Sequence, residues 1–272
     1  TRNADWQVPG VQCYASLSEA IEATATDSER FIIGGGTVYA QALDQVDRLY
    51  ITEIQVELSG DTQFPSWRDN TWRLCSTERV ITTNSLEYTA NGQRYQGVMA
   101  YEAGDEERPV ILIAPAFEGC NELMVSHAKR WASQGYLAVV LDVYGGGHVA
   151  STLEDCMAHL QPLFDDRASL QSCLLSGFEA AVAQPQADAS RVVAIGFCLG
   201  GLCVLDLARV GADVKGVVSV HGVLMPPANV PNPQVVAKVL ALHGYQDPQV
   251  DDEQVNGFYE EMTTAGVDWQ MH

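Results

Sequence analysis

The sequence predicts an α/β protein in which a mostly parallel sheet is covered by helices on both faces. Three observations predict this fold. From Pro109 onward, short apolar runs alternate with helical patterns, which is the order typical of parallel sheets. The apolar runs, such as PVILIA and VVAIGF, are continuous, as in strands buried on both faces. The pair Asn91-Gly92 lies between two alternating segments and predicts a β-hairpin.

The composition narrows the function classes. The chain has 272 residues, a net charge of −20 and a pI near 4.4. This acidity argues against nucleic-acid or anionic membrane partners, which need a basic footprint; a solvated surface explains it. No apolar run approaches the ~18 residues of a membrane span, and the first residues lack a signal-peptide pattern. We therefore expect a small-molecule substrate, while the oligomeric state stays open.

Cysteine usage points to a reducing compartment. The seven cysteines are Cys13, Cys75, Cys120, Cys156, Cys173, Cys198 and Cys203. Their number is odd, their spacings are scattered, and no CxxC pair occurs, which favours neither a disulfide framework nor a zinc site. We expect a cytoplasmic protein without a metal site.

Two segments are expected, 1–82 and 83–272. The first is a small, β-rich α/β piece. Ser16 and Glu19 form a candidate capping box. In order, we expect a helix at 16–24, a strand at 30–36 ending in three glycines, a helix at 37–45, and strands at 47–58 and 71–82.

The second segment carries the main sheet. After the hairpin at 85–103 we expect strands at 108–117, 136–147, 191–197 and 214–222, a strand and loop at 238–248, helices at 120–135, 170–184, 199–211 and 252–266, and a last strand from 267. Reactive groups of open α/β sheets collect at the carboxyl ends of the strands, so we expect the catalytic side chains at these ends.

The turn after the strand RVVAIGF holds a candidate nucleophile. Cys198 lies in Gly-Phe-Cys-Leu-Gly-Gly, where the glycines relieve crowding in a sharp strand-to-helix turn. The backbone N–H of Leu199 and the helix dipole favour a thiolate and an oxyanion. Asp247 follows a later strand, and Phe117 could give a second oxyanion N–H. The alternative is that Cys198 is a small buried hydrophobe, as we expect of Cys203.

Six stretches in this order resemble the dienelactone hydrolase family: RPVILIAPAFEG, GYLAVVLDVYGGG, RVVAIGFCLGG, VKGVVSVHG, LALHGYQDP and EEMTTAGVDWQMH. Members are α/β-hydrolases that use a cysteine on esters and lactones and need no cofactor. The resemblance implies that Cys198 is the nucleophile, that Asp247 orients a histidine, and that Phe117 and Leu199 supply the oxyanion hole.

Two departures from the family pattern matter. The family commonly has a glutamate where this chain has Ala116, with Glu118 nearby. The family's triad histidine lies several residues past the position of His272, so the resemblance places the base beyond this chain and little activity is expected of it. His221, His243 or His272 are the alternatives within the chain.

Three residues are candidates for substrate binding: Glu118, Tyr144 and Arg167. The Arg167 guanidinium could bind a substrate carboxylate bidentately. The alternative is a solvated residue at a helix start, beside Asp165 and Asp166.

The first segment holds a second candidate site. Gly34, Gly35 and Gly36 precede a helix, and such a loop can bind an anion or simply form a tight turn. The stretch FIIGGGTVYAQALDQVDRLYITEIQVELSGDTQFPSW resembles the C-terminal half of dihydrofolate reductase. The resemblance implies that these glycines and Thr37 line the NADPH pyrophosphate, Tyr39 the nicotinamide and Thr52 the pteridine site.

The family's N-terminal half, with the central strand and the substrate carboxylate, has no counterpart in this sequence. We therefore expect a poorly ordered or packed fragment with no reductase activity, and NADPH binding only in a complete reductase. Three functions remain: a cysteine-dependent hydrolase, a truncated bifunctional folate enzyme, and a non-catalytic scaffold or small-molecule binder of the same fold.

Overall fold

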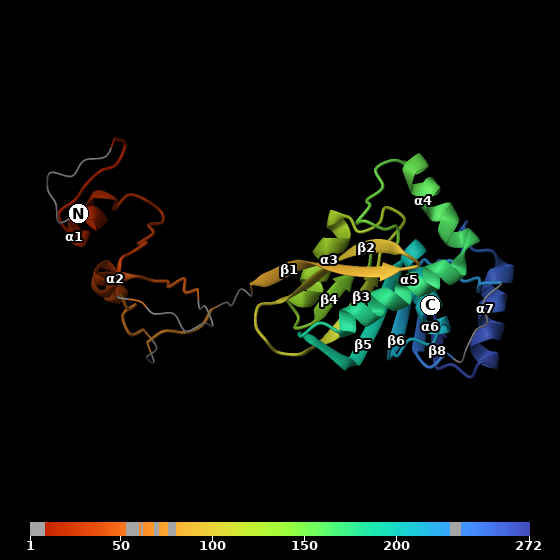
Figure 1. Cartoon of the computed structure of the whole chain (residues 1–272). Helices are drawn as coiled ribbons and strands as arrows, with labels where there is room; N and C mark the ends of the chain where they lie inside the picture. Colours follow the sequence, from red (N-terminus) through yellow and green to blue (C-terminus); the bar gives the residue numbers. More distant parts are fainter. Residues whose placement is uncertain (1–8, 53–59, 61, 68–70, 76–79, 229–234) are drawn as a thin grey trace. The chain divides into compact units, whose positions relative to one another are not determined.

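A computed structural model describes residues 9–52, 60, 62–67, 71–75, 80–228 and 235–272. The chain divides into two compact units, Thr1–Thr77 and Glu78–His272, which are drawn in Figure 1. Each unit is described by itself.

The described part of the first unit is helical. It contains α1 (Leu17–Ala23), α2 (Gly36–Ala42) and the 3₁₀ turn η1 (Leu43–Gln45). The expected cap of α1 is present, because the Ser16 hydroxyl accepts from the Glu19 amide at 3.2 Å. The Glu19 carboxylate accepts in turn from the Ala15 amide at 3.1 Å, one residue earlier than in a standard capping box.

The strands expected in the first unit are not found among its described residues. Residues 30–33, 47–52 and 71–75 are not in strands, and 53–59 and 76–79 lie outside the described residues. A strand needs a neighbour to bond its backbone groups, and no described residue of this unit offers one. Residues 81–82 instead begin the first strand of the second unit.

The second unit contains one eight-stranded sheet. Its strands are β1 (Ile81–Ala90), β2 (Gln93–Glu102), β3 (Arg108–Ala114), β4 (Leu137–Val140), β5 (Ala187–Phe197), β6 (Gly216–Val220), β7 (Lys238–Leu242) and β8 (Trp269–Met271). They are ordered β1-β2-β4-β3-β5-β6-β7-β8. The pairs β1/β2 and β2/β4 are antiparallel and all others are parallel. The expected hairpin and mostly parallel sheet are confirmed.

Helices pack on both faces of this sheet (Figure 1). They are α3 (Glu122–Ala132), α5 (Arg167–Val182), α6 (Leu199–Arg209) and α7 (Asp252–Thr264), while α4 (Leu153–Asp165) packs on α5. Side chains of α5, α6 and α7 join the larger hydrophobic cluster, and those of α3 pack against β2, β3 and β4 in a second cluster. The continuous apolar strands are thus explained by burial from two sides.

The strand order places the loops after β3 and β5 side by side. The chain runs from β3 to β4 on one side and returns to β5 on the other, so the order reverses at β3. At such a point the loops leave in opposite directions and open a crevice at the carboxyl ends. The crevice receives the loop after Ala114 from β3 and Cys198 from β5.

Helix α4 was not expected from the sequence. The Thr152 hydroxyl caps it by accepting from the Asp155 amide at 3.2 Å. Pro162 lies inside the helix, and an interior proline normally argues against one. Here the lost bond is the one to the Ala158 carbonyl, and only Leu163, Phe164 and Asp165 follow in the helix, so the disruption falls at its end. Within the described residues, none of the helices has the length and apolar character needed to traverse a bilayer.

Candidate active site

Cys198 lies on a strained turn between β5 and α6. Its backbone angles are φ 54° and ψ −111°, a left-handed conformation that costs a non-glycine residue of order 1–3 kcal/mol. The Cys198 amide donates to the Val220 carbonyl at 2.9 Å, and the Gly201 amide donates to the Cys198 carbonyl at 2.9 Å. Both bonds hold the half-buried sulfur at the sheet's carboxyl edge.

The neighbouring glycines are required by space. A Cβ atom on Gly196 would overlap the Gly200 carbonyl, and one on Gly200 would overlap the carbonyl of Ala114. The absence of these side chains lets the first turn of α6 approach the end of β3. The sharp turn expected around Cys198 is therefore present, with the expected role for its glycines.

The environment of the Cys198 thiol opposes its ionisation. Burial raises the pKa of Cys198, the Leu199 amide that hydrogen-bonds the sulfur lowers it, and the charges of Glu118 and Asp247 raise it further, with a net shift above the ordinary value. The thiol is therefore protonated at neutral pH, and a nucleophilic role requires a base to remove the proton.

Replacing Glu118 by glutamine is expected to lower the pKa of Cys198, because it removes a negative charge that disfavours the thiolate. At pH 8, iodoacetamide should then label Cys198 faster, by about two- to tenfold. Labelling rates across pH 6–10, mapped by mass spectrometry, measure the shift. Glu122→Gln, a control on α3, should leave the profile unchanged; an unshifted Glu118→Gln profile would contradict the placement of this charge.

Asp247 has a histidine partner. It follows β7 in a turn, and its side chain is 2% exposed. One carboxylate oxygen accepts from the Gln249 amide at 2.9 Å, and the other lies 2.5 Å from His221 Nδ1. Burial favours the neutral acid, but the Gln249 amide and the His221 ring outweigh it and lower the pKa of Asp247. A carboxylate that holds an imidazole at Nδ1 fixes its tautomer and leaves Nε2 for proton transfer.

His221 lies next to Cys198 in the strand order. It follows Val220, which pairs with Phe197, the residue before Cys198. His221 therefore ends β6 at the level at which Cys198 ends β5, with φ 56° and a side chain 47% exposed.

The other two histidines at this edge are placed differently. His243 Nδ1 is buried without a hydrogen-bond partner among the described residues and lies 3.9 Å from Asp247. The His272 carbonyl accepts from the His243 amide at 2.7 Å, which joins the ends of β7 and β8. Of the alternatives within the chain, His221 is the one hydrogen-bonded to the acid.

The loop after β3 is fastened by Tyr144. The Tyr144 hydroxyl donates to the Phe117 carbonyl at 2.7 Å, and burial raises the pKa of that hydroxyl. The Tyr144 and Gly145 amides both donate to Asp142 Oδ1 at 2.9 Å. Asp142, a buried residue just after β4, was not singled out from the sequence, although an aspartate before three glycines suggests a turn.

Arg167 does not face the crevice as a free cation. Its Nε and Nη2 atoms bond the two carboxylate oxygens of Asp206 at 2.7 and 2.6 Å, and the two side chains are 8% and 0% exposed. Both expectations for Arg167 are wrong. The side chain is buried and not solvated, and the carboxylate that it binds bidentately is that of Asp206 and not of a substrate. The reason is that α5 packs on α6, a contact that sequence spacing does not reveal.

The candidate cofactor residues lie in the first unit. Gly35 is the N-cap of α2, and its carbonyl accepts from Val38 and Tyr39 at 2.9 and 3.0 Å. The Tyr39 ring packs against Phe64 with centroids 4.8 Å apart. Gly34, Gly36 and Thr37 border the same turn, and Thr52 is exposed. Their proposed contacts with NADPH stay predictions.

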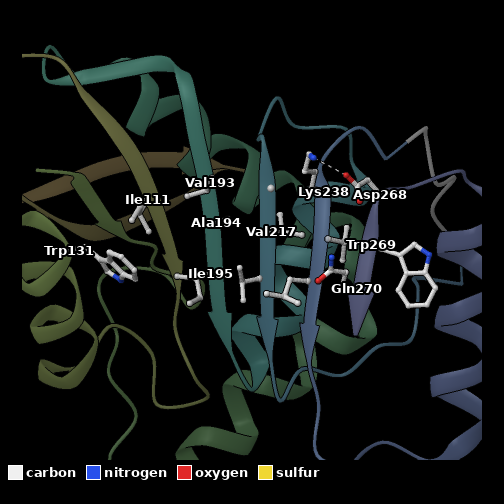
Figure 2. Close-up of a pocket in the computed structure, with 14 residues that line it drawn as sticks. Ile111, Trp131, Val193, Ala194, Ile195, Val217, Lys238, Asp268, Trp269 and Gln270 are labelled. Atoms are coloured by element: carbon white, nitrogen blue, oxygen red, sulfur yellow. Dashed lines mark ion pairs between the residues drawn. The ribbon is translucent and has the colours of Figure 1, made fainter. Parts of the chain in front are cut away.

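The larger pocket is away from this chemistry. It has a volume near 410 Å³ and lies on the sheet face formed by β5 to β8. Figure 2 shows apolar side chains such as Ile195 and Val217 along this face, with Trp131 and Trp269 at its sides and a Lys238–Asp268 ion pair of 2.8 Å. Neither Cys198 nor Asp247 lines it, so the pocket does not define the reaction site.

Comparison with known proteins separates the same two parts. A family model described as "Dienelactone hydrolase family" matches residues 96–272, and one described as "Dihydrofolate reductase" matches residues 1–96. Residues 81–96 of the second match belong structurally to β1 and β2 of the hydrolase sheet. The hairpin therefore serves the second unit, as expected.

Solved structures resemble the second unit. One called m3DLH is 31% identical, with a TM-score of 0.67, over 71% of this chain and 80% of its own. A dienelactone hydrolase-like promiscuous phosphotriesterase from metagenomic libraries is 32% identical, with a TM-score of 0.67, over 70% of this chain and 80% of its own.

Curated relatives of the chain include two dihydrofolate reductases. Dihydrofolate reductase type 3 of Salmonella typhimurium is 44% identical over 73 residues, which are 27% of this chain and 45% of the relative. Dihydrofolate reductase of Bacillus subtilis (strain 168) is 29% identical over 104 residues, 38% of this chain and 62% of the relative. The chain thus spans roughly half the length of these reductases.

Proposed function

The chain belongs to the dienelactone hydrolase family, and from this premise we propose that its second unit hydrolyses small esters or lactones with Cys198 as the nucleophile. The observation that carries the proposal is the Cys198 turn. A half-buried thiol lies on a strained backbone, has a pKa that the Leu199 amide lowers, and ends β5 beside the Asp247–His221 pair. The phosphotriesterase named among the similar structures supports testing phosphotriesters as further substrates.

The proposed reaction has two steps. A histidine takes the Cys198 proton, and the sulfur attacks the substrate carbonyl to form a tetrahedral oxyanion held by the Leu199 and Phe117 amides. Collapse expels the alkoxide, which receives the proton from the histidine, and leaves an acyl-thioester. Water, deprotonated by the same histidine, then attacks the thioester and releases the carboxylic acid and the thiol.

The base has two candidates. His221 is hydrogen-bonded to Asp247 in this structure, and the family resemblance implies a histidine in a loop past His272. If a histidine of that loop is the base, a chain that includes the loop should turn over more ester than these 272 residues do, because that histidine would replace His221 on Asp247. In these 272 residues, His221 is the histidine that hydrogen-bonds the Asp247 carboxylate.

A comparison of variants tests this assignment. Turnover of 4-nitrophenyl acetate is measured for both lengths, each with His221→Ala and with His243→Ala as a matched histidine control. If turnover in the extended form falls by about 10³-fold in His221→Ala, His221 is the base. If it survives His221→Ala, the base is the further histidine. If the 272-residue chain turns over the ester at the same rate with and without His221, a base oriented by Asp247 is contradicted for this chain.

The match to dihydrofolate reductase favours a second candidate, a bifunctional folate enzyme in which NADPH binding requires a complete reductase part. We expect no dihydrofolate reduction by this chain, because the described residues of this unit form no sheet to support a cofactor groove. NADPH titration, followed by protein fluorescence, should show no saturable binding up to about 1 mM. A Kd above that concentration corresponds to a binding free energy weaker than about 4 kcal/mol. NADPH oxidation dependent on dihydrofolate would contradict this expectation.

A further inference from the structure

Two histidines and one aspartate lie together at the start of α4, outside the proposed triad. His148 is in the loop after β4, and Asp155 and His159 lie one turn apart on α4. Asp155 Oδ1 is 3.1 Å from His148 Nε2 and 3.1 Å from His159 Nδ1. We infer that these three side chains bind a divalent transition-metal ion of the zinc class.

The distances suit such an ion. Zinc bonds to nitrogen and oxygen are about 2.0–2.2 Å, and in a tetrahedron the ligand atoms are then roughly 3.3–3.5 Å apart. Two of the three edges already measure 3.1 Å. All three ligand atoms lie within 4.8 Å of one another, so small side-chain movements complete the triangle.

The ligand types select the class of ion. Two imidazoles and one carboxylate favour zinc, cobalt, nickel or copper, whereas magnesium and calcium favour oxygen alone. The side chains of His148, His159 and Asp155 are 36%, 35% and 27% exposed. An ion can therefore enter from solvent, and water can fill its remaining position. The expectation that the chain has no metal site rested on cysteine spacing, which does not address histidines.

The ring orientations must change for the ion to bind. The two imidazoles are stacked, with centroids 3.9 Å apart and planes 18° apart. Nitrogen lone pairs lie in the ring planes, so one ring must turn for both to point at one ion. His159 Nδ1 also lies 2.9 Å from the Asp155 carbonyl, and its hydrogen must move to Nε2. Binding needs neutral imidazoles, so it should weaken as the pH is lowered.

A carboxylate ready for a cation anchors the cluster. The Ser151 amide donates to Asp155 Oδ2 at 3.2 Å, and this bond, outweighing the effect of burial, lowers the pKa of Asp155 together with the His148 ring. The carboxylate is ionised at neutral pH and keeps its orientation through the second oxygen, as ligating carboxylates do.

The bound ion would tie the β4 loop to α4. That loop also contacts the proposed oxyanion loop, because the Ala150 amide donates to the Glu118 carbonyl at 2.9 Å and Gly119 forms a β-bridge with Val149. Metal binding should therefore also restrain the loop that holds Phe117. The proposal gives the ion no role in the reaction at Cys198.

The test is a titration of the untagged full chain with Co²⁺ at pH 7.5, followed by visible absorption, and with Zn²⁺ by calorimetry. One equivalent should bind with nitrogen and oxygen ligands and without a thiolate-to-cobalt band. His148→Ala and His159→Ala should each weaken binding at least tenfold. His127→Ala, a control whose ring stacks on Phe197 outside the cluster, should bind like the wild type.

Thermal melts keep the test valid if a variant is less stable. Zn²⁺ should raise the Tm of the wild type and of His127→Ala, since it binds only the folded state, and should leave the Tm of His159→Ala unchanged. The proposal is overturned if no stoichiometric binding occurs, if a thiolate band appears, or if binding survives both cluster variants. Loss of binding in His221→Ala in place of these variants would assign the ion to the Asp247 region and overturn it equally.

Discussion

Replacing Cys198 by alanine is expected to lower kcat/KM for 4-nitrophenyl acetate by at least about 10³-fold, because it removes the proposed nucleophile. The measurement uses both the 272-residue chain and a chain that includes the loop past His272, so that the loss of kcat/KM is measured whichever histidine is the base. Intact-mass analysis adds a second readout: acetyl transfer should appear on Cys198 and be absent from Cys198→Ala. The fold should survive, since the sulfur is half-buried and its backbone bonds do not use the side chain.

The matched control is Cys120→Ala. Cys120 is also half-buried in the same unit, and burial, followed by the charge of Asp142, raises the pKa of its thiol to about 12. Its replacement should change kcat/KM by less than about twofold. If Cys198→Ala retains turnover, or if iodoacetamide labels Cys198 no faster than Cys120, the fold serves as a scaffold or binder and the cysteine mechanism is wrong.

Replacing Asp206 by alanine is expected to lower the free energy of unfolding by about 3–5 kcal/mol. Asp206 is fully buried and accepts from Arg167 at 2.7 and 2.6 Å and from Arg209 at 3.3 Å. Removing it leaves two buried guanidinium groups short of a counter-charge. Arg209 keeps the Glu261 carboxylate at 2.7 Å, whereas Arg167 keeps only a 3.4 Å contact with the Met225 carbonyl. Urea unfolding followed by circular dichroism measures the loss.

Asp213→Ala is the control for this prediction. Asp213 forms a 2.8 Å pair with Lys215, but the two side chains are 74% and 52% exposed. Water screens such a pair, so its loss should change the free energy of unfolding by no more than about 0.5 kcal/mol. If the two variants are destabilised equally, the buried network does not hold α5 against α6 as the contacts suggest.

The comparison of sequence and structure differs between the units. In the second unit, the continuous apolar strands and the Asn91-Gly92 turn are local signals, and the sheet they predict is present. In the first unit, strand-like residues such as 47–52 have no strand among the described residues. The residues there favour a strand, but no described segment of this unit lies beside them to form one. Strand pairing depends on tertiary structure and not on local propensity alone.

The sequence by itself determined the sharp turn around Cys198. Gly196, Cys198 and Gly200 lie within five consecutive residues, and the sterics that demand small residues around a strand-to-helix turn act over that short range. It also placed Asp247 at a strand end, because alternating strands and helices bring all carboxyl ends to one edge.

Only the tertiary structure decided which partners these residues have. Asp247 takes His221, 26 positions earlier, and Arg167 takes Asp206, 39 positions later. The His148, Asp155 and His159 cluster forms because an unexpected helix follows a glycine-rich loop. Hydrogen bonds and ion pairs act over about 3 Å, and which groups come that close depends on how strands are ordered and helices packed. Spacing along the chain does not contain that information.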